Sequence, residues 1–333
     1  MGADRQVLGI DVGGTKVAVG AVDGVEITEL EESPTESGDA AALLDGIEAT
    51  ARRVIDRVGR PPAVGVGVPS QIEYATGTVE SSVNIPLAGV PLREELGRRF
   101  GVPVFVDNDA NCAALAEAHL VDDGPARVLV MLTLGTGVGG GVVLDGETFR
   151  GAHGLGAELG HFTLDPEGPP CPGNCPNRGC VEAYCSGQAL ERDATEFAAD
   201  MPGSHLAAVL AAEGRVTGRA LAELAREGDA DALRLFERFS RMLGVAIAGY
   251  VNVFEPEYVV IGGGLSQASD LYLEHAVDQA SSRALPALWR RVTVSLARGG
   301  ATAGVIGAGV LAAQEAAARD TAPVRIESIE GAE

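Results

Sequence analysis

Lysine is nearly absent from this 333-residue sequence. Lys16 is the single lysine, and 25 lysine and arginine residues stand against 47 acidic ones, which gives a net charge of −22. This charge repels nucleic acid, polyphosphate and anionic lipid surfaces at long range, so we expect no nucleic-acid or membrane partner. The use of arginine in place of lysine fits a GC-rich genome or adaptation to heat or salt, and the sequence does not separate these explanations.

Long apolar runs are also missing. We find no stretch that would span a bilayer, and the start MGADRQVLGI lacks a charged region followed by an apolar one, so we expect a cytoplasmic protein. Cysteine is scarce, and four of the five cysteines fall within residues 171–185, which is not a spread disulfide framework. A chain of this length with 46% hydrophobic residues is expected to form two globular domains.

The segment 104–120, VFVDNDANCAALAEAHL, reads as a strand, a polar turn and a helix. Ligands of open α/β sheets bind beyond the carboxyl ends of strands, so Asp107, Asn108, Asp109 and Asn111 are expected to face a substrate. The alternative is that these side chains only cap the helix. The two interpretations are compatible, because the helix dipole keeps a carboxylate at this position ionised while it accepts a proton or a hydrogen bond.

Two glycine-rich turns each join a pair of apolar strands. They are Asp11-Val12-Gly13-Gly14-Thr15-Lys16, within residues 7–21, and Gly135-Thr136-Gly137, within residues 129–143. Glycine lets backbone N–H groups approach an anion closely, and Asp11 could hold a metal-bound water. Either turn alone could be an ordinary hairpin, but the pair suggests a duplicated architecture with two phosphate-facing turns across a cleft. No Walker loop is present.

Hydrophobic spacing predicts the remaining elements. We expect helices at 40–58, 229–254, from about 269, and 303–318, and strands at 64–69, 258–261 and 292–297. A third glycine turn, Gly262-Gly263-Gly264, suits the adenine or ribose of a nucleotide, although such strand-to-helix turns are common. Asn84 lies in a loop, where asparagine is often only a turn former.

Residue types that bind metals gather after the second glycine turn. His161 is followed by Cys171-x3-Cys175-x4-Cys180, and three cysteines with one histidine are the composition of a closed, tetrahedral zinc site. Reduced free thiols and a redox pair are the alternatives. The Pro- and Gly-rich loop 164–177 has few other groups to hold it in place, which favours zinc.

Taken in order, these motifs resemble those of the ROK family of repressors and sugar kinases, and most closely its bacterial glucokinase branch. They are D-x-G-G-T, D-N-D-A-N, L-G-T-G-x-G-G-G, E-L-G-H, C-x3-C-x4-C-x-E and I-G-G-G, between about Leu8 and Ala313. The family's usual C-x-C-x4-C is C-x3-C-x4-C here, which changes the loop and keeps the ligand count. Cys185 has no counterpart, and we expect it to be a small buried residue.

The resemblance implies an α/β, actin-like (ribonuclease H-like) ATPase fold with two domains that flank a cleft. The smaller domain would contain residues 1–122 and about 301–320, the larger one residues 123–300 with the zinc loop, and 321–333 would be a polar tail. Sugar and ATP with Mg2+ would bind between the domains, and Zn2+ would bind His161, Cys171, Cys175 and Cys180.

Residue roles follow from the same resemblance. Asp109 would be the general base on the 6-hydroxyl of the sugar, and hydrogen bonds to sugar hydroxyls would come from Asn84, Asn108, Glu158, His161 and Glu182. His161 could serve zinc with one ring nitrogen and sugar with the other. Magnesium and the nucleotide would be bound by Asp11, Gly13, Gly14, Thr15, Lys16, Gly135, Thr136, Gly137, Gly262, Gly263 and Gly264.

We therefore expect ATP-dependent phosphorylation of glucose to glucose 6-phosphate by a homo-oligomer, either a dimer or a tetramer. A kinase for N-acetylglucosamine, N-acetylmannosamine or fructose is the main alternative, because the loops around the 2-position of the sugar set that preference. A sugar-responsive repressor is disfavoured, since it needs a helix-turn-helix ahead of the first hairpin and a charge that tolerates DNA.

Overall fold

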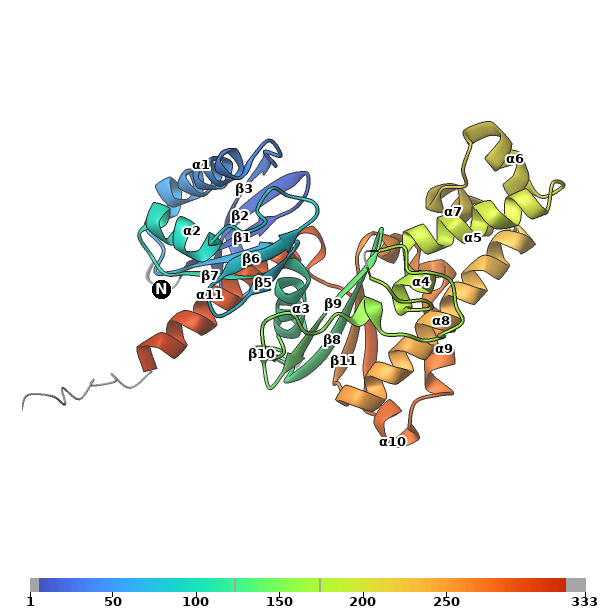
Figure 1. Cartoon of the computed structure of the whole chain (residues 1–333). Helices are drawn as coiled ribbons and strands as arrows, with labels where there is room; N and C mark the ends of the chain where they lie inside the picture. The colour runs from blue at the N-terminus through green and yellow to red at the C-terminus, as the bar shows by residue number, and fades with distance from the viewer. Residues whose placement is uncertain (1–5, 123, 174, 322–333) are drawn as a thin grey trace, which may run out of the picture. The chain divides into compact units, whose positions relative to one another are not determined.

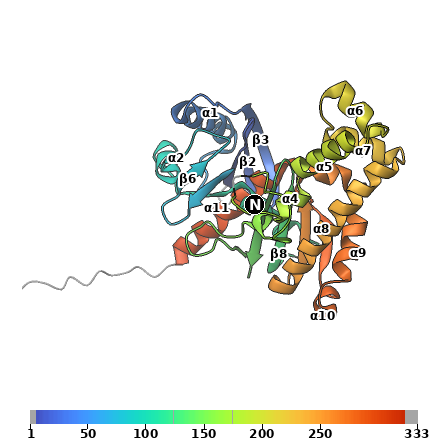
Figure 2. The same cartoon turned by 45° about the vertical axis from the view of Figure 1, so that its right-hand side comes forward.

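The computed structural model describes residues 6–122, 124–173 and 175–321 and has the predicted α/β class (Figure 1). Its contacts divide the described chain into two compact units. Unit 1 is formed from the described parts of residues 1–72, 76–107 and 305–333, and unit 2 from those of residues 73–75 and 108–304. Figure 2 shows the same elements after a turn of 45°.

A sheet of order β3-β2-β1-β4-β7 lies at the centre of unit 1. Its strands are β1 (Val7–Val12), β2 (Lys16–Asp23), β3 (Glu26–Pro34), β4 (Val64–Val68) and β7 (Val104–Asn108). β1 and β2 form the predicted hairpin, β3 pairs antiparallel with β2, and β4 pairs parallel with β1. A small separate sheet pairs β5 (Ser70–Glu73) with β6 (Thr78–Ser82).

Three helices accompany the sheet of unit 1, namely α1 (Ala40–Val58), α2 (Leu92–Phe100) and α11 (Ala303–Thr321), the last of which begins in unit 2. The bounds of α1 confirm the helix predicted at 40–58. The side chain of Asp39 accepts the backbone N–H of Ala42 at 2.8 Å and so caps the first turn. The apolar face of α1, including Leu43 and Ile47, is buried in the core of the unit.

Helix α11 packs closely against the sheet of unit 1. A side chain on Gly9 of β1 would overlap the carbonyl oxygen of Val305, and one on Gly65 of β4 that of Ala308. By length and apolar composition the helical stretch 300–319 could cross a membrane, so the expectation that no such stretch exists is wrong. Half of that stretch is buried within the protein, as in the core helix of a globular fold, and its alanines and glycines fit this close packing.

The sheet of unit 2 repeats the order of the first. It runs β10 (Glu147–Thr148), β9 (Val138–Leu144), β8 (Val128–Leu134), β11 (Tyr258–Gly262) and β12 (Thr293–Leu296). β8, β9 and β10 pair antiparallel, and β11 then pairs parallel with both β8 and β12. The prediction of a duplicated strand-turn-strand architecture is confirmed.

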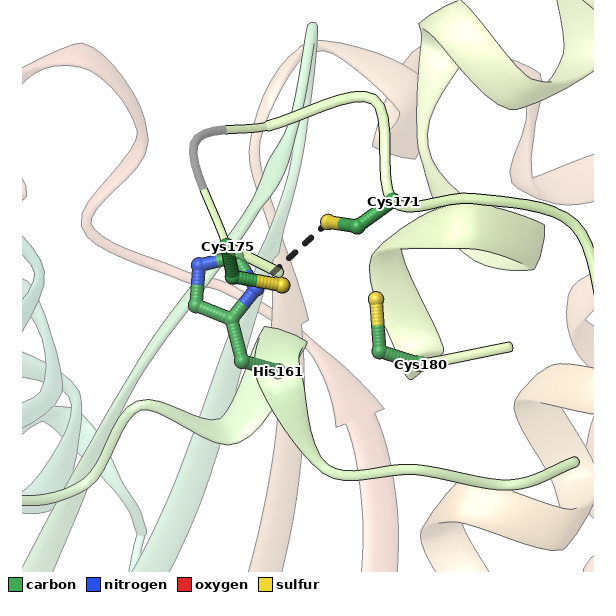
Figure 3. A group of neighbouring side chains, drawn as sticks. All are labelled: His161, Cys171, Cys175 and Cys180. Atoms are coloured by element: carbon green, nitrogen blue, oxygen red, sulfur yellow. Dashed lines mark hydrogen bonds between the residues drawn. The ribbon is translucent and has the colours of Figure 1, made fainter. Parts of the chain in front are cut away.

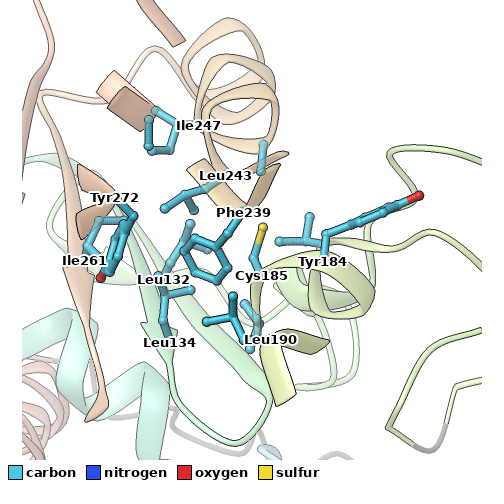
Figure 4. Close-up of a cluster of buried hydrophobic side chains, with 14 of the residues drawn as sticks. Leu132, Leu134, Tyr184, Cys185, Leu190, Phe239, Leu243, Ile247, Ile261 and Tyr272 are labelled. Atoms are coloured by element: carbon cyan, nitrogen blue, oxygen red, sulfur yellow. The ribbon is translucent and has the colours of Figure 1, made fainter. Parts of the chain in front are cut away.

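The helices of unit 2 are α3 (Asp109–Leu120), α4 (Val181–Cys185), α5 (Gly187–Asp200), α6 (His205–Glu213), α7 (Gly218–Arg226), α8 (Ala230–Phe254), α9 (Leu273–Ser281) and α10 (Pro286–Trp289), with 3-10 turns η2 (Leu159–His161), η3 (Gly264–Leu271) and η4 (Gly300–Thr302). Side chains from β8, β11, α4 and α8 share one apolar core (Figure 4). Cys185 lies in this core with no exposed surface, which confirms its expected role as a small buried residue.

Two predicted boundaries differ from the structure, and a third falls mostly outside the described residues. The helix expected from about residue 269 is a 3-10 helix from Gly264 followed by α9 from Leu273, because the third glycine turn tightens directly into helical turns. The tail expected from residue 321 lies almost wholly outside the described residues, and Thr321 itself ends α11. The predicted domain boundary at 122 and the division by contacts differ by helix α3, which contacts β8 and β9 of unit 2.

Candidate active site

Asp109 occupies the first turn of α3, directly after β7. The helix cap is the neighbouring Asn108, whose side-chain oxygen accepts the N–H groups of Ala110 at 2.9 Å and Asn111 at 3.3 Å. Asp109 accepts the Ala110 N–H through Oδ1 at 2.8 Å. The interpretation that these polar residues cap the helix therefore holds for Asn108, whereas Asp109 stands beyond the cap.

Burial raises the pKa of the Asp109 carboxyl above its ordinary value. The Ala110 N–H and a hydrogen bond from the Asn108 side chain oppose this rise, and desolvation outweighs them. The expectation that the helix N-terminus keeps this pKa low is therefore wrong. A carboxylate with a raised pKa is a stronger base and suits proton transfer better.

The glycines of β9 position helix α3. A Cβ on Gly141 would lie 2.6 Å from the Cβ of Ala114 and 2.9 Å from the carbonyl oxygen of Ala110, so only glycine allows the helix to lie this close to the strand. A Cβ on Gly139 would come within 3.7 Å of the Ala110 side chain. The first turn of α3, with Asp109, thus lies beside the strand that leaves the second glycine turn.

The other end of α3 is held by Glu117, which sequence reasoning missed. This carboxylate is 1% exposed and accepts the backbone N–H of Arg298 at 2.9 and 3.0 Å and that of Gly299 at 2.8 Å. Arg298 in turn makes two hydrogen bonds to Asp122, beyond the end of α3. Helix α3 begins where the chain passes from unit 1 into unit 2 at residue 108. Through Glu117 it also holds residues 298 and 299, shortly before the chain returns to unit 1 at residue 305.

We expect Glu117→Ala to lower the free energy of unfolding by about 3 kcal/mol, because it removes the charged acceptor of hydrogen bonds from two part-buried N–H groups. Urea denaturation measures this change. Asp122→Asn is the control, since it weakens an exposed ion pair of the same segment and should change stability little. Equal losses of unfolding free energy in the two variants would argue against a stabilising role for the hydrogen bonds of Glu117.

The second and third glycine turns lie side by side in unit 2. β11 runs parallel to β8, with Gly262 opposite Thr133, so both turns follow carboxyl ends of neighbouring strands. Gly263 has a φ of 83°, and a Cβ there would overlap the backbone of Leu134, just before the second turn. A Cβ on Gly135 or Gly264 would meet nothing within 4 Å, which leaves open backbone at both turns.

Backbone hydrogen bonds fix the second turn. Gly135 donates to the carbonyl of Gly137 at 2.9 Å, and the first residues of α5, Gly187 and Gln188, donate to the carbonyls of Gly135 at 2.7 Å and Thr136 at 3.3 Å. The turn is therefore held both by its own backbone and by the start of α5.

The first glycine turn and Asn84 come together in unit 1. Gly13 donates to the carbonyl of Lys16 at 2.8 Å, and the Thr35 hydroxyl donates to the carbonyl of Gly13 at 2.7 Å. A Cβ on Gly14 would lie 3.8 Å from the Cβ of Asn84. The structure thus joins two predicted site residues that are distant in the sequence.

Lys16 is engaged elsewhere. Its ammonium lies 2.6 Å from a carboxylate oxygen of Glu32 on β3, in a pair whose side chains are about half exposed. Because this ion pair is solvent-accessible, it is weak and an anionic ligand could displace it. Asp11, at the carboxyl end of β1, is partly buried beside the same turn.

The predicted zinc ligands converge in unit 2 (Figure 3). The ligand atoms of His161, Cys171, Cys175 and Cys180 all lie within 4.8 Å of one another, and the Cys171 sulfur is 3.7 Å from Nδ1 of His161. His161 ends η2 and Cys180 caps α4. Burial and the neighbouring thiols raise the pKa of the Cys171 thiol. A bound dication would relieve this, and the donor set and spacing fit Zn2+.

Glu182 links this cluster to the second glycine turn. Its carboxylate is buried, accepts the Val138 N–H at 2.8 Å and lies 3.4 Å from the Cys171 sulfur. A side chain on Gly137 or on Gly173 would overlap this carboxylate. Glu182 therefore packs both against the loop that carries Cys171 and against the start of β9.

Glu158 is exposed and follows Ala157, which has a positive φ of 65°. Non-glycine residues rarely adopt this conformation, and such strain is common beside functional residues. The next turn is supported by Tyr250 of α8, which donates to the carbonyl of Leu159 at 2.6 Å. Tyr250 lies within an apolar helix pattern, so the sequence carried no signal for this role.

In sum, unit 2 holds Asn108, Asp109, Glu158, His161, Glu182 and two glycine turns, while unit 1 holds Asp11, Asn84 and the first turn.

Comparison with known proteins identifies relatives of this chain. The model of the ROK family matches residues 7–315. The glucokinase of Halalkalibacterium halodurans is 36% identical over 324 residues, which cover 94% of this chain and 96% of that protein. An N-acetyl-D-glucosamine kinase of Photobacterium profundum is 35% identical, with coverage of 80% and 86%.

Solved structures that resemble this chain come from the same family. The ROK hexokinase from Thermus thermophilus superposes with a TM-score of 0.82 at 37% identity, over 95% of this chain and 99% of that one. A ROK family glucokinase from Streptomyces griseus, solved with glucose and AMPPNP, gives a TM-score of 0.74 at 32% identity, over 93% and 99%. These neighbours confirm the predicted actin-like, two-domain α/β fold. The chain belongs to the ROK family.

Proposed function

We propose that this protein transfers the γ-phosphoryl group of ATP to the 6-hydroxyl of glucose. The observation that carries the proposal is the Asp109 carboxylate, with its raised pKa, in the first turn of α3 beside the second glycine turn. The glucokinase relatives support glucose as the acceptor, and the Streptomyces griseus complex with AMPPNP supports ATP as the donor.

In this mechanism Asp109 accepts the proton of the 6-hydroxyl as the hydroxyl oxygen attacks the γ-phosphorus. Phosphoryl transfer has a loose transition state, so positioning and charge stabilisation supply most of the catalysis. The other sugar hydroxyls would be bound by Asn84, Asn108, Glu158, His161 and Glu182. Asp11 would hold a water of Mg2+, while the phosphates and nucleotide would meet the three glycine turns, including Thr15, Lys16 and Thr136.

We further propose Zn2+ as a structural ion on His161, Cys171, Cys175 and Cys180. Bound there, it would supply a rigid tetrahedral link that sets the position of the buried Glu182, one of the proposed sugar-binding residues. Assembly into a dimer or tetramer and a cytoplasmic location remain parts of the same proposal.

A panel of sugars with ATP and Mg2+ tests the acceptor. Glucose should exceed mannose, fructose, N-acetylglucosamine and N-acetylmannosamine in kcat/KM, by up to about 10^4 where a hydroxyl with a bound partner is lost or inverted. N-acetylglucosamine is the second candidate, because the chain is also related to a kinase of that sugar. A tenfold preference for an N-acetylated sugar would replace glucose in this proposal.

A further inference from the structure

A cavity of about 230 Å3 lies between helices α8 and α9 of unit 2. Its lining is basic, which is unusual in a chain with a net charge of −22. The lining residues are Arg234, Glu237, Arg238, Arg241, His275 and Gln279. None of them belongs to the catalytic or zinc-binding residues proposed above.

The arginines follow one face of α8 at spacings of four and three residues. Like charges at these spacings repel one another and destabilise a helix unless counter-charges are present. Arg234 pairs with Asp231 at 3.2 Å, and Arg238 with Asp193 at 2.9 Å. Arg241 makes no hydrogen bond or ion pair with the residues that the structure describes, so its guanidinium can bind a ligand.

The opposite wall comes from α9. His275 lies in the first turn of this helix, at the positive end of its dipole, and Tyr272 caps the helix without a side-chain hydrogen bond. The His275 and Gln279 side chains lie within 3.1 Å of each other. Both walls therefore offer hydrogen-bond donors. Glu237 is the one carboxylate in the lining, while Asp231 and Asp193 neutralise two of the three arginines from outside it and leave the charge of Arg241 for a ligand.

A second arginine-lined cavity, in unit 1, does not have this property. Its Arg52 and Arg60 donate to the carbonyls of Arg99 and Gly101 at the end of α2, and Arg99 pairs with acidic side chains of α1. Those arginines neutralise a negative helix end. In the α8–α9 cavity, Arg234 and Arg238 each pair with one carboxylate, whereas Arg241 lies in the body of α8 and pairs with none among the described residues.

We propose that the α8–α9 cavity binds a small phosphate monoester, of the same chemical class as a hexose phosphate. A phosphate dianion has three acceptor oxygens and can accept bidentate hydrogen bonds from more than one guanidinium group. A carboxylate has one charge and two oxygens, so it matches fewer arginines. The proposal rests on the proposed function only for the choice of hexose phosphate as a probe.

Calorimetric titration of the full chain with inorganic phosphate and with glucose 6-phosphate tests this site. Saturating glucose and AMPPNP occupy the proposed catalytic site during the titration, and low salt strengthens the remaining contacts. Arg241→Gln should weaken binding of each ligand about tenfold. Arg238 is left intact, because it also pairs with Asp193 and lies over the Tyr184 ring.

The matched control is Arg215→Gln, which removes the same charge from an exposed position outside the cavity and should bind within twofold of the unmodified chain. Tighter binding of glucose 6-phosphate would identify the hexose phosphate as the ligand, and tighter binding of phosphate the free anion. Equal affinities of Arg241→Gln and Arg215→Gln, or no binding by the unmodified chain, would overturn the site. Kinase activity in phosphate-free buffer should be the same in both variants as in the unmodified chain. If the unmodified chain has no kinase activity, this result counts against the proposed function and not against the phosphate site.

Discussion

Asp109→Asn should lower turnover by about 10^2 to 10^4 and leave the affinity for glucose within about tenfold. The amide keeps the size of the side chain and can still bond a hydroxyl, but it cannot accept the proton. Steady-state kinetics with direct measurement of glucose binding separates the two effects. Asp122→Asn, beyond the far end of the same helix, removes the same charge from an exposed carboxylate and should leave turnover unchanged.

The raised pKa of Asp109 adds a pH dependence to this prediction. The base form is lost as pH falls through the raised pKa, so the acid limb of kcat/KM should lie above the ordinary value of 3.8. The stabilising contribution of the protonated carboxyl is present below 3.8 and is lost as pH rises through the raised pKa. Asp109→Asn should therefore be no less stable than the unmodified chain at neutral pH. Near-normal turnover in this variant would remove Asp109 from its role.

Cys175→Ser should lose zinc and weaken glucose binding together. Serine is a poor zinc ligand, and the loop that carries Cys171 packs on Glu182 through Gly173, so release of the metal frees that carboxylate. We expect KM for glucose to rise by roughly tenfold or more, as for other losses of support around a metal site. Elemental analysis of protein purified without chelators measures the zinc directly.

Cys112→Ser is the matched control for the zinc prediction. Cys112 is a buried thiol of α3 and lies outside the cluster, so this variant should keep about one zinc per chain. Zinc far below that level in the unmodified protein would contradict the site. Loss of zinc from Cys175→Ser without any change in glucose binding would contradict the prediction that the metal positions Glu182 for glucose binding.

Local patterns predicted much of this fold. The bounds of α1 follow from its apolar spacing, and the hairpin of β1 and β2 from the glycines between two apolar runs. The convergence of His161 with the three cysteines followed from residue type and spacing. Short-range chemistry determines each of these features.

Features that depend on tertiary packing were missed or misjudged. The pKa of Asp109 was expected to be low from its helix position, whereas burial in the folded chain raises it. Glu117 accepts a hydrogen bond from a residue 181 positions away, and the only local signal was a carboxylate in the middle of an alanine-rich helix. The apolar composition of α11 reflects its packing against the glycines of β1 and β4, which the helix sequence alone does not reveal.

The most direct test of the account is the position of the transferred phosphoryl group. Glucose, ATP and Mg2+ are incubated with the purified chain, and the product is identified by phosphorus and proton NMR. The account predicts glucose 6-phosphate with one equivalent of ADP, formed at least about a hundredfold more slowly by Asp109→Asn. Phosphorylation at another hydroxyl, or release of phosphate from ATP without a sugar phosphate, would contradict it.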